Sequence, residues 1–157
     1  MSNALPNYLA EPDSLANLVT NLDVAECAAA EPAYLECIEY AIAQLNLPNT
    51  FMYLDAGHCG WLGWSANIGP AATLFNQVWT AAGSPKQVRG LATNVANYNA
   101  WSISTPPSYT TGDSNYDEQL YVNALAPLLT PLGFPAHFIT ETCKRLAAQS
   151  LLLLLIP

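Results

Sequence analysis

The chain has 157 residues, of which 52% are hydrophobic and 10% charged, which is enough for one domain with a sizeable core. Four Lys and Arg against twelve Asp and Glu give a formal net charge of -8 at pH 7. Because this charge repels phosphate backbones and anionic lipid surfaces, neither nucleic acid nor a membrane is expected as a partner. Few charges beside many tryptophans and tyrosines suit a neutral, polyhydroxylated ligand, although a large core would produce the same balance.

In the first third of the chain, residues 7–10 read as a strand and residues 15–22 as a short helix, where leucine and valine recur at helical spacing. Pro32 is interpreted as the first residue of a second helix, because apolar side chains recur every three or four residues after it. That helix is expected to end within residues 46–49. Residues 50–54 are short, apolar and bounded by turn residues, which predicts a buried strand.

The remaining elements continue the alternation of strand and helix. A helix is predicted over residues 70–83, opened by a proline and closed by a glycine, and a strand over residues 88–95. A long loop over residues 97–114 precedes a helix over 116–129, and residues 136–140 form the last predicted strand. Strands that alternate with helices predict an α/β fold with right-handed crossovers and a parallel sheet covered on both faces.

Two adjacent acids, Asp117 and Glu118, fall in the first turn of the helix predicted over 116–129. Acidic side chains are favourable there because of the helix dipole. We interpret this pair as charge on a solvent-exposed face, without a role in chemistry.

Four cysteines occur, and none shows the spacing of metal ligands: Cys27, Cys37, Cys59 and Cys143. No metal is therefore expected, and without a phosphate-binding glycine loop or a dinucleotide fingerprint no cofactor is expected either. The number of cysteines permits disulfides but does not define their connectivity. No secretory signal is expected within the first residues, and the apolar run 151–156 is far shorter than the roughly 20 residues that span a bilayer.

Candidate binding residues follow the strands, where parallel sheets bind ligands. The run 53–64 reads YLDAGHCGWLGW and places Asp55, His58, Trp61 and Trp64 among glycines directly after a strand. Indoles stack on sugar rings, acids and amides bind hydroxyl groups, and glycines let the backbone approach the ligand. Residues of the same kinds follow two other strands, namely Asp13, Asn94 and Asn97. These three groups predict a sugar site at one rim of the sheet.

Each of these residues also has a structural alternative. Asp13 could cap the helix that follows it, and His58 could be a structural histidine bonded to Asp55 or to the backbone. Trp61 and Trp64 could lie side by side in the core if helical, but the neighbouring glycines favour an exposed aromatic loop. The asparagines of residues 94–99 could be turn formers.

Three long strings resemble glycoside hydrolase family 6, and fungal cellobiohydrolases of the second type above all: EPDSLANLV at 11–19, YLDAGHCGWLGW at 53–64 and RGLATNVANYNAW at 89–101. The resemblance covers residues 11–139. It implies a partial, distorted (β/α) barrel, and inverting hydrolysis of β-1,4-glucosidic bonds that releases cellobiose outside the cell. The partner it implies is cellulose or a cello-oligosaccharide, bound by a monomer.

Carried over by position, the resemblance makes Asp13 the general acid that protonates the leaving oxygen. His58, Trp61 and Asn97 become substrate contacts, and Trp64 extends the stacking platform. Such an acid needs its ionised form disfavoured by burial or by a nearby carboxylate. Inversion also needs a second carboxylate roughly 6.5–9.5 Å away; Asp55 is the other acid expected at this rim, whereas the family's proposed base lies further along its sequence.

The chain also departs from the family. An arginine-aspartate-cysteine motif, whose aspartate supports the general acid and whose cysteine pairs with the one at position 27, has no counterpart before Asp13, and residues 140–157 do not follow the family pattern. Residues 1–157 are thus expected to form a single partial catalytic domain with divergent ends at 1–10 and 140–157, inactive alone. A non-catalytic glucan-binding protein and a truncated product without function are the alternatives.

Overall fold

The computed structural model describes residues 7–10, 13–142 and 154–156. Within these residues, five strands form one sheet in the order in which they occur in the sequence. They are β1 (Asn7–Ala10), β2 (Phe51–Asp55), β3 (Val88–Thr93), β4 (His137–Thr140) and β5 (Leu154–Ile156). The first four are parallel, as predicted, whereas β5 pairs antiparallel with β4 and comes from a run for which no element was predicted.

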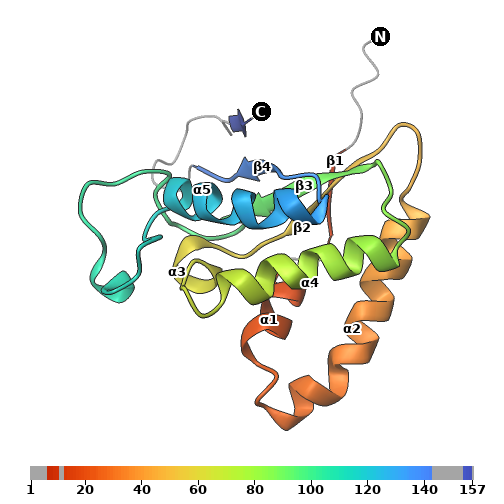
Figure 1. The fold of residues 1–157 in the computed structure, drawn as a ribbon, viewed down its shortest axis with the longest axis horizontal. Coiled ribbons are helices and arrows are strands. Elements are labelled where there is room, and N and C mark those ends of the chain that lie inside the picture. Colours follow the sequence, from red (N-terminus) through yellow and green to blue (C-terminus); the bar gives the residue numbers. More distant parts are fainter. Residues whose placement is uncertain (1–6, 11–12, 143–153, 157) are drawn as a thin grey trace.

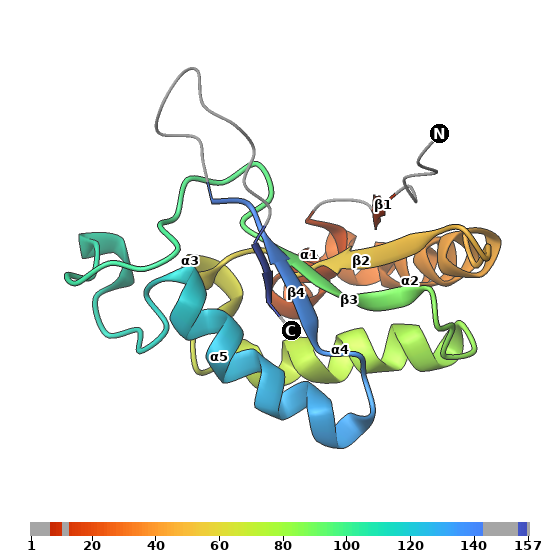
Figure 2. The ribbon, with the colours of Figure 1, turned by 90° about the horizontal axis from the view of Figure 1, so that it is seen from above.

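In the described part of the chain, five α-helices connect the strands: α1 (Ser14–Thr20), α2 (Ala25–Gln44), α3 (Cys59–Leu62), α4 (Ile68–Ala81) and α5 (Glu118–Leu129). Two 3-10 turns lie at Ser108–Thr110 and Thr130–Leu132. The long helices α2, α4 and α5 contact one another in sequence order and form a layer on one side of the sheet (Figures 1 and 2). The expected cover on both faces is wrong for the described residues, because right-handed crossovers between strands added in one direction place every helix on the same side. This arrangement is that of part of an α/β barrel.

Helix α2 begins earlier than the apolar pattern indicates. Its first residue is Ala25, and the Ala28 backbone N–H already donates to the Val24 carbonyl at 3.0 Å. The first turns are exposed or half-buried, so helix propensity rather than an apolar stripe defines them. Pro32 therefore lies inside the helix, and the prediction that it opens the helix is wrong.

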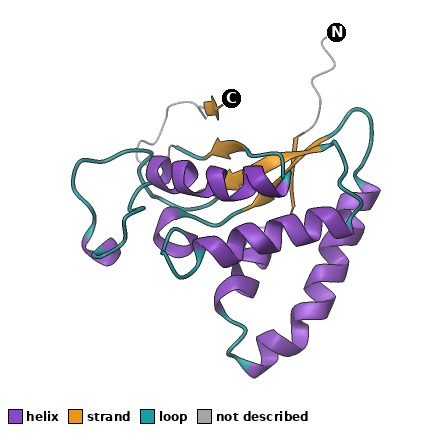
Figure 3. Ribbon diagram, viewed as in Figure 1, coloured by secondary structure: helices purple, strands orange, loops and turns teal. Residues whose placement is uncertain are grey.

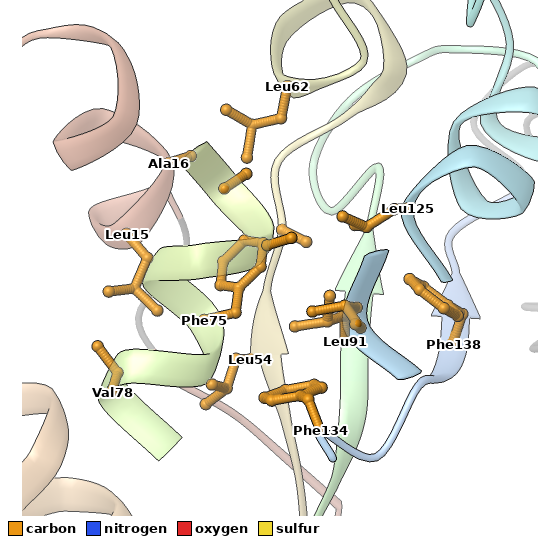
Figure 4. Close-up of a cluster of buried hydrophobic side chains, with 14 of the residues drawn as sticks. Leu15, Ala16, Leu54, Leu62, Phe75, Val78, Leu91, Leu125, Phe134 and Phe138 are labelled. Atoms are coloured by element: carbon orange, nitrogen blue, oxygen red, sulfur yellow. The ribbon is translucent and has the colours of Figure 1, made fainter. Parts of the chain in front are cut away.

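The core lies between the sheet and the helix layer. Leu54, Leu91 and Phe138 are aligned across β2, β3 and β4 and are at most 2% exposed. They meet Phe75 of α4 and Leu125 of α5, both fully buried, in the cluster that Figure 4 shows. Burying side chains of this size stabilises the fold by roughly 1.5–3 kcal/mol each.

Side chains alternate across a strand, so Tyr53 and Asp55 of β2 point away from the side on which Leu54 meets the helices. That opposite side is the interior of the partial barrel. The segments that follow β2 and β3 leave the same end of the sheet (Figure 3), which brings α3 and the long loop after β3 together there. Within the described residues, no helix combines the length and the hydropathy needed to cross a bilayer.

Candidate functional site

Asp55 ends β2 and organises the backbone around it. Its Oδ2 accepts hydrogen bonds from the backbone N–H groups of Asp13, at 2.8 Å, and Gly57, at 3.3 Å. Both of these residues have positive φ angles, 67° and 56°, a conformation that is uncommon outside glycine and that aspartate adopts more readily than most other residues. The carboxylate thus holds two left-handed turns that come from separate parts of the chain.

Burial dominates the electrostatics of Asp55, which is 3% exposed. It raises the pKa of Asp55 to about 6; the two backbone hydrogen bonds act against the rise, and the negative charge of Asp13 adds to it. The side chain of Asp13 is exposed. It stands at the N-cap position of α1 but makes no side-chain capping bond, so the structural alternative of a helix cap is not supported. The site therefore pairs an exposed acid with a buried one.

His58 directly precedes α3 and is half-buried. Its Nδ1 is buried and has no hydrogen-bond partner among the described residues, so the expected bond to Asp55 or to the backbone is absent at that atom. Burial lowers the pKa of His58, and the charge of Asp13 acts in the opposite direction. The imidazole lies 6.0 Å from the Trp61 ring, centroid to centroid, at an angle of 55°. An imidazole whose Nδ1 has no hydrogen-bond partner among the described residues therefore lies beside an indole, within the electrostatic influence of Asp13.

The two tryptophans belong to a short helix and the turn after it, not to the exposed loop that was expected. The Trp61 Nε1–H donates to Thr20 Oγ1 at 3.0 Å, and the Trp64 Nε1–H donates to the Gly60 carbonyl at 3.1 Å. Both indoles are half-buried, and Trp61 packs against the core. The expectation was wrong because Gly60 and Gly63 did not prevent a helix here. The helix has only 4 residues, which is enough for one turn.

The asparagines after β3 divide into two kinds. Asn94 is 1% exposed with a φ of 62°, and its amide bonds both the N–H and the carbonyl of Asn99 and the carbonyl of Glu141. It forms the turn, as its structural alternative proposed. Asn97 is half-buried, donates from Nδ2 to the Val95 carbonyl at 3.3 Å, and faces a cavity.

That cavity has a volume of about 530 Å³ and lies in the long loop after β3. Its lining consists of Asn94, Asn97, Tyr98, Asn99, Ala100, Trp101, Ile103, Pro107, Tyr109 and Thr142. Asp13 and Trp61 do not line it. Tyr109 links it to α3: its hydroxyl donates to Asn99 Oδ1 at 3.1 Å, and a Cβ placed on Gly60 would lie 3.4 Å from its ring.

The structure contradicts the interpretation of Asp117 and Glu118 as solvent-exposed charge, because they are 2% and 0% exposed. Asp117 caps α5 by accepting the Leu120 N–H at 2.8 Å, and its other oxygen accepts the Ile103 N–H at 3.1 Å. Glu118 Oε1 accepts the Cys59 N–H at 2.9 Å. The capping role of Asp117 could have been found from the preference for aspartate before a helix, but nothing in the sequence indicates the partner of Glu118.

The thiols of Cys27, Cys37 and Cys59 are free, and Cys143 lies outside the described residues. Burial, reinforced by the charge of Glu118, raises the pKa of the Cys59 thiol above its usual range, which leaves it unreactive. In the described part of the chain, no three His, Cys, Asp or Glu side chains gather as metal ligands would.

Residues 4–151 match the glycosyl hydrolases family 6, and the chain belongs to this family. It is 72% identical over 134 residues to the probable 1,4-beta-D-glucan cellobiohydrolase C of Aspergillus fumigatus, which covers 85% of the chain and 30% of that protein. It is 70% identical over 132 residues to the 1,4-beta-D-glucan cellobiohydrolase C of Emericella nidulans, covering 84% of the chain and 29% of that protein.

Solved structures agree with the sequence comparison. The catalytic core domain of the cellobiohydrolase Cel6A from Chaetomium thermophilum superimposes with a TM-score of 0.85 at 57% identity, over 91% of this chain and 41% of that one. Cellobiohydrolase II (Cel6A) from Humicola insolens, in complex with glucose and cellotetraose, gives 0.86 at 54% identity, over 94% and 42%. The chain thus spans less than half the length of each of these relatives.

Proposed function

We propose that the rim at the ends of β1 and β2 binds a β-1,4-glucan such as cellulose or a cello-oligosaccharide. The observation that supports this most directly is that Asp13, Asp55, His58 and Trp61 lie together although they come from two stretches of the chain. One hydrogen bond joins the first two, the charge of Asp13 acts on His58, and His58 lies beside the indole. An acid, an imidazole and an aromatic ring provide the hydroxyl contacts and the stacking surface that a sugar ring needs.

The chemistry that we propose for this rim is hydrolysis of the β-1,4-glucosidic bond with inversion, releasing cellobiose. Asp13 is the proposed general acid: its carboxyl gives its proton to the leaving oxygen while water attacks the opposite side of the sugar. Asp55 supports Asp13 by holding its backbone N–H and by adding a second carboxyl nearby. His58, Trp61 and Trp64 are the proposed substrate contacts, and Asn97 continues the path towards the cavity of about 530 Å³.

We propose further that this chain is part of an extracellular, monomeric glucan hydrolase and that it does not cleave glucan by itself. The family resemblance assigns the catalytic base, and the aspartate that supports the acid, to sequence without a counterpart here. The second candidate is a protein that only binds glucan, and the half-buried indole of Trp61 beside His58 favours it because stacking does not depend on a catalytic base.

The test combines a cellulose pull-down with a measurement of reducing-sugar release. Binding without release supports a glucan-binding chain, release shows that the chain is itself a hydrolase, and the absence of both contradicts the proposed function. Trp61→Ala is expected to weaken cellotetraose binding about tenfold. Tyr40→Ala, which removes an exposed aromatic side chain from α2, serves as its control.

The role of Asp13 is tested in a chain that releases reducing sugar, either this one or a longer chain that contains it. Asp13→Asn is expected to lower release at least about a hundredfold, the typical contribution of a general acid. Binding should stay nearly unchanged, because the Asp13 backbone N–H remains available to Asp55. Asp23→Asn is the matched control, since Asp23 is also exposed and lies outside the rim. Release that persists in Asp13→Asn would show that another group is the acid.

A further inference from the structure

The turn that carries His58 and Trp61 has a support that the proposed function does not use. The N–H of Cys59, the first residue of α3, donates to Glu118 Oε1 at 2.9 Å, and both residues are 0% exposed. An N–H at the first position of a helix has no acceptor within that helix. Without the carboxyl of Glu118, this buried N–H would have lost its partner.

Glu118 is itself held in place by its surroundings. Its own N–H donates to the Ala100 carbonyl at 3.2 Å, and the next N–H, of Gln119, donates to the Trp101 carbonyl at 2.8 Å. Burial raises the pKa of the Glu118 carboxyl, and the Cys59 N–H and the nearby side chains of Cys59, Thr93 and Asn99 act against this rise. The second oxygen, Oε2, is buried and has no hydrogen-bond partner among the described residues. The start of α5 thus bonds the long loop through its backbone and α3 through the Glu118 side chain.

His58 stands between two such contacts. The N–H before it, of Gly57, donates to Asp55, and the N–H after it, of Cys59, donates to Glu118. The two carboxyls come from β2 and α5, so two separate elements determine the direction of the backbone on either side of the imidazole. Gly60 leaves room for the rings of Tyr109 and His58, because a Cβ there would lie 3.4 Å from Tyr109 and 3.6 Å from His58 Nδ1. This packing limits how the turn can shift.

We propose that Glu118 is a positioning residue for His58 and Trp61, acting through the backbone N–H of Cys59. Its consequence for ligand binding rests on the proposed function, whereas the positioning itself does not. An oxygen acceptor at this place keeps α3 in the orientation that presents both rings to the rim. If Glu118 only stabilised the core, its substitution would destabilise all parts of the fold to the same extent.

The first experiment uses the unaltered chain. Hydrogen exchange of the Cys59 N–H should be at least about a hundredfold slower than in an unstructured peptide, because this N–H is buried and bonded. A Cys59 N–H that exchanges as fast as an exposed one would overturn the proposal without any substitution.

The second experiment compares Glu118→Gln, which keeps an acceptor oxygen, with Glu118→Met, which has a similar size and no oxygen. In Glu118→Met, exchange at Cys59 should accelerate at least about tenfold relative to the core N–H of Leu91, and cellotetraose binding should weaken about tenfold. Glu118→Gln should stay within about threefold of the unaltered chain in both measurements. Glu36→Gln and Glu36→Met, on an exposed position of α2, control for the loss of charge and of polarity.

The outcomes separate the two proposals. Equal acceleration at Cys59 and Leu91 in Glu118→Met would mean a general loss of stability and would refute positioning. If no variant and not even the unaltered chain binds cellotetraose, the proposed function fails, while the Cys59 exchange still decides the role of Glu118. If Glu118→Met does not fold, Glu118→Gln decides, because unprotected exchange at Cys59 in that variant would contradict the need for an acceptor oxygen.

Discussion

Asp55 and Glu118 are two buried carboxyls that use the same device and differ in their surroundings. Each accepts a backbone N–H next to His58, from Gly57 and from Cys59. Asp55 has the exposed carboxyl of Asp13 beside it, whereas Glu118 is enclosed by Cys59 and Thr93. The comparison teaches that the rim depends on carboxyls as hydrogen-bond acceptors for the backbone, and that Asp55 is the one placed next to the proposed acid.

The largest expected effect comes from a substitution at Gly57, whose backbone N–H donates to Asp55. Gly57 has a φ of 56°, and a Cβ there would lie 3.2 Å from Trp61 Cε3. Gly57→Val should therefore lower the free energy of unfolding by about 4 kcal/mol, from left-handed strain and forced contact together. Chemical denaturation measures this loss. Gly69→Ala is the control, because a Cβ at Gly69 meets nothing within 4 Å; a Gly57→Val variant as stable as this control would show that the turn is not constrained.

The second effect is a dependence of stability on pH, which comes from the buried surroundings of Asp55. Because the pKa of Asp55 is raised from 3.8 to about 6 in the folded chain, the folded state binds more protons than the unfolded state between these values. This contribution to stability is therefore present at low pH and is lost as the pH rises from about 4 to about 6. A difference of about two pKa units corresponds to about 2–3 kcal/mol.

Asp55→Asn removes this titration and keeps an oxygen for the N–H groups of Asp13 and Gly57. The difference in unfolding free energy between the two chains should change by that amount from pH 4 to pH 7, with Asp55→Asn relatively more stable at pH 7. Denaturation curves at several pH values measure it. The lowered pKa of His58 acts on both chains and cancels in the difference; a difference that does not vary with pH would contradict the assignment of the raised pKa to Asp55.

The smallest effect tests a third support of the rim, after Asp55 and Glu118. This support is a hydrogen bond from Tyr121 of α5. The hydroxyl of Tyr121 donates to the carbonyl of Ala56 at 2.8 Å, and Tyr121 is 0% exposed. Tyr121→Phe should cost about 1 kcal/mol, since it leaves one buried carbonyl without this partner. Thermal unfolding would detect this change, and Tyr40→Phe, at a side chain that is 66% exposed, should be neutral. Equal stability of both variants would remove Tyr121 from the supports of the rim.

Much of the architecture followed from local patterns. The strand over residues 50–54 and the helix over 70–83 were predicted to within two residues, because short apolar runs and amphipathic spacing are read directly from neighbouring side chains. The start of α2 was missed because its first turns are exposed and carry no apolar stripe. The helical turn that begins at Cys59 was also missed, because Gly60 and Gly63 disfavour a helix there.

The candidate site also contains some residues that were predicted from the sequence and one that was not. Asp55, His58 and Trp61 stand within one short run and could be named from it, and the rule that ligands bind at strand ends placed Asp13 beside them. Glu118 could not be found, since 59 residues separate it from the N–H that it accepts. An acid in the first turn of a helix is normally exposed and interacts favourably with the helix dipole, so the local pattern predicted the wrong environment for Glu118.

By itself, the sequence determined the alternation of strands and helices, the family and the residue types at the rim, because each of these depends on local order along the chain. Only the tertiary structure decided which carboxyls are buried, which N–H groups they accept, and that all the long helices lie on one side of the sheet. The physical reason is that burial and hydrogen-bond partners depend on which distant segments pack together, and neighbouring residues do not define that.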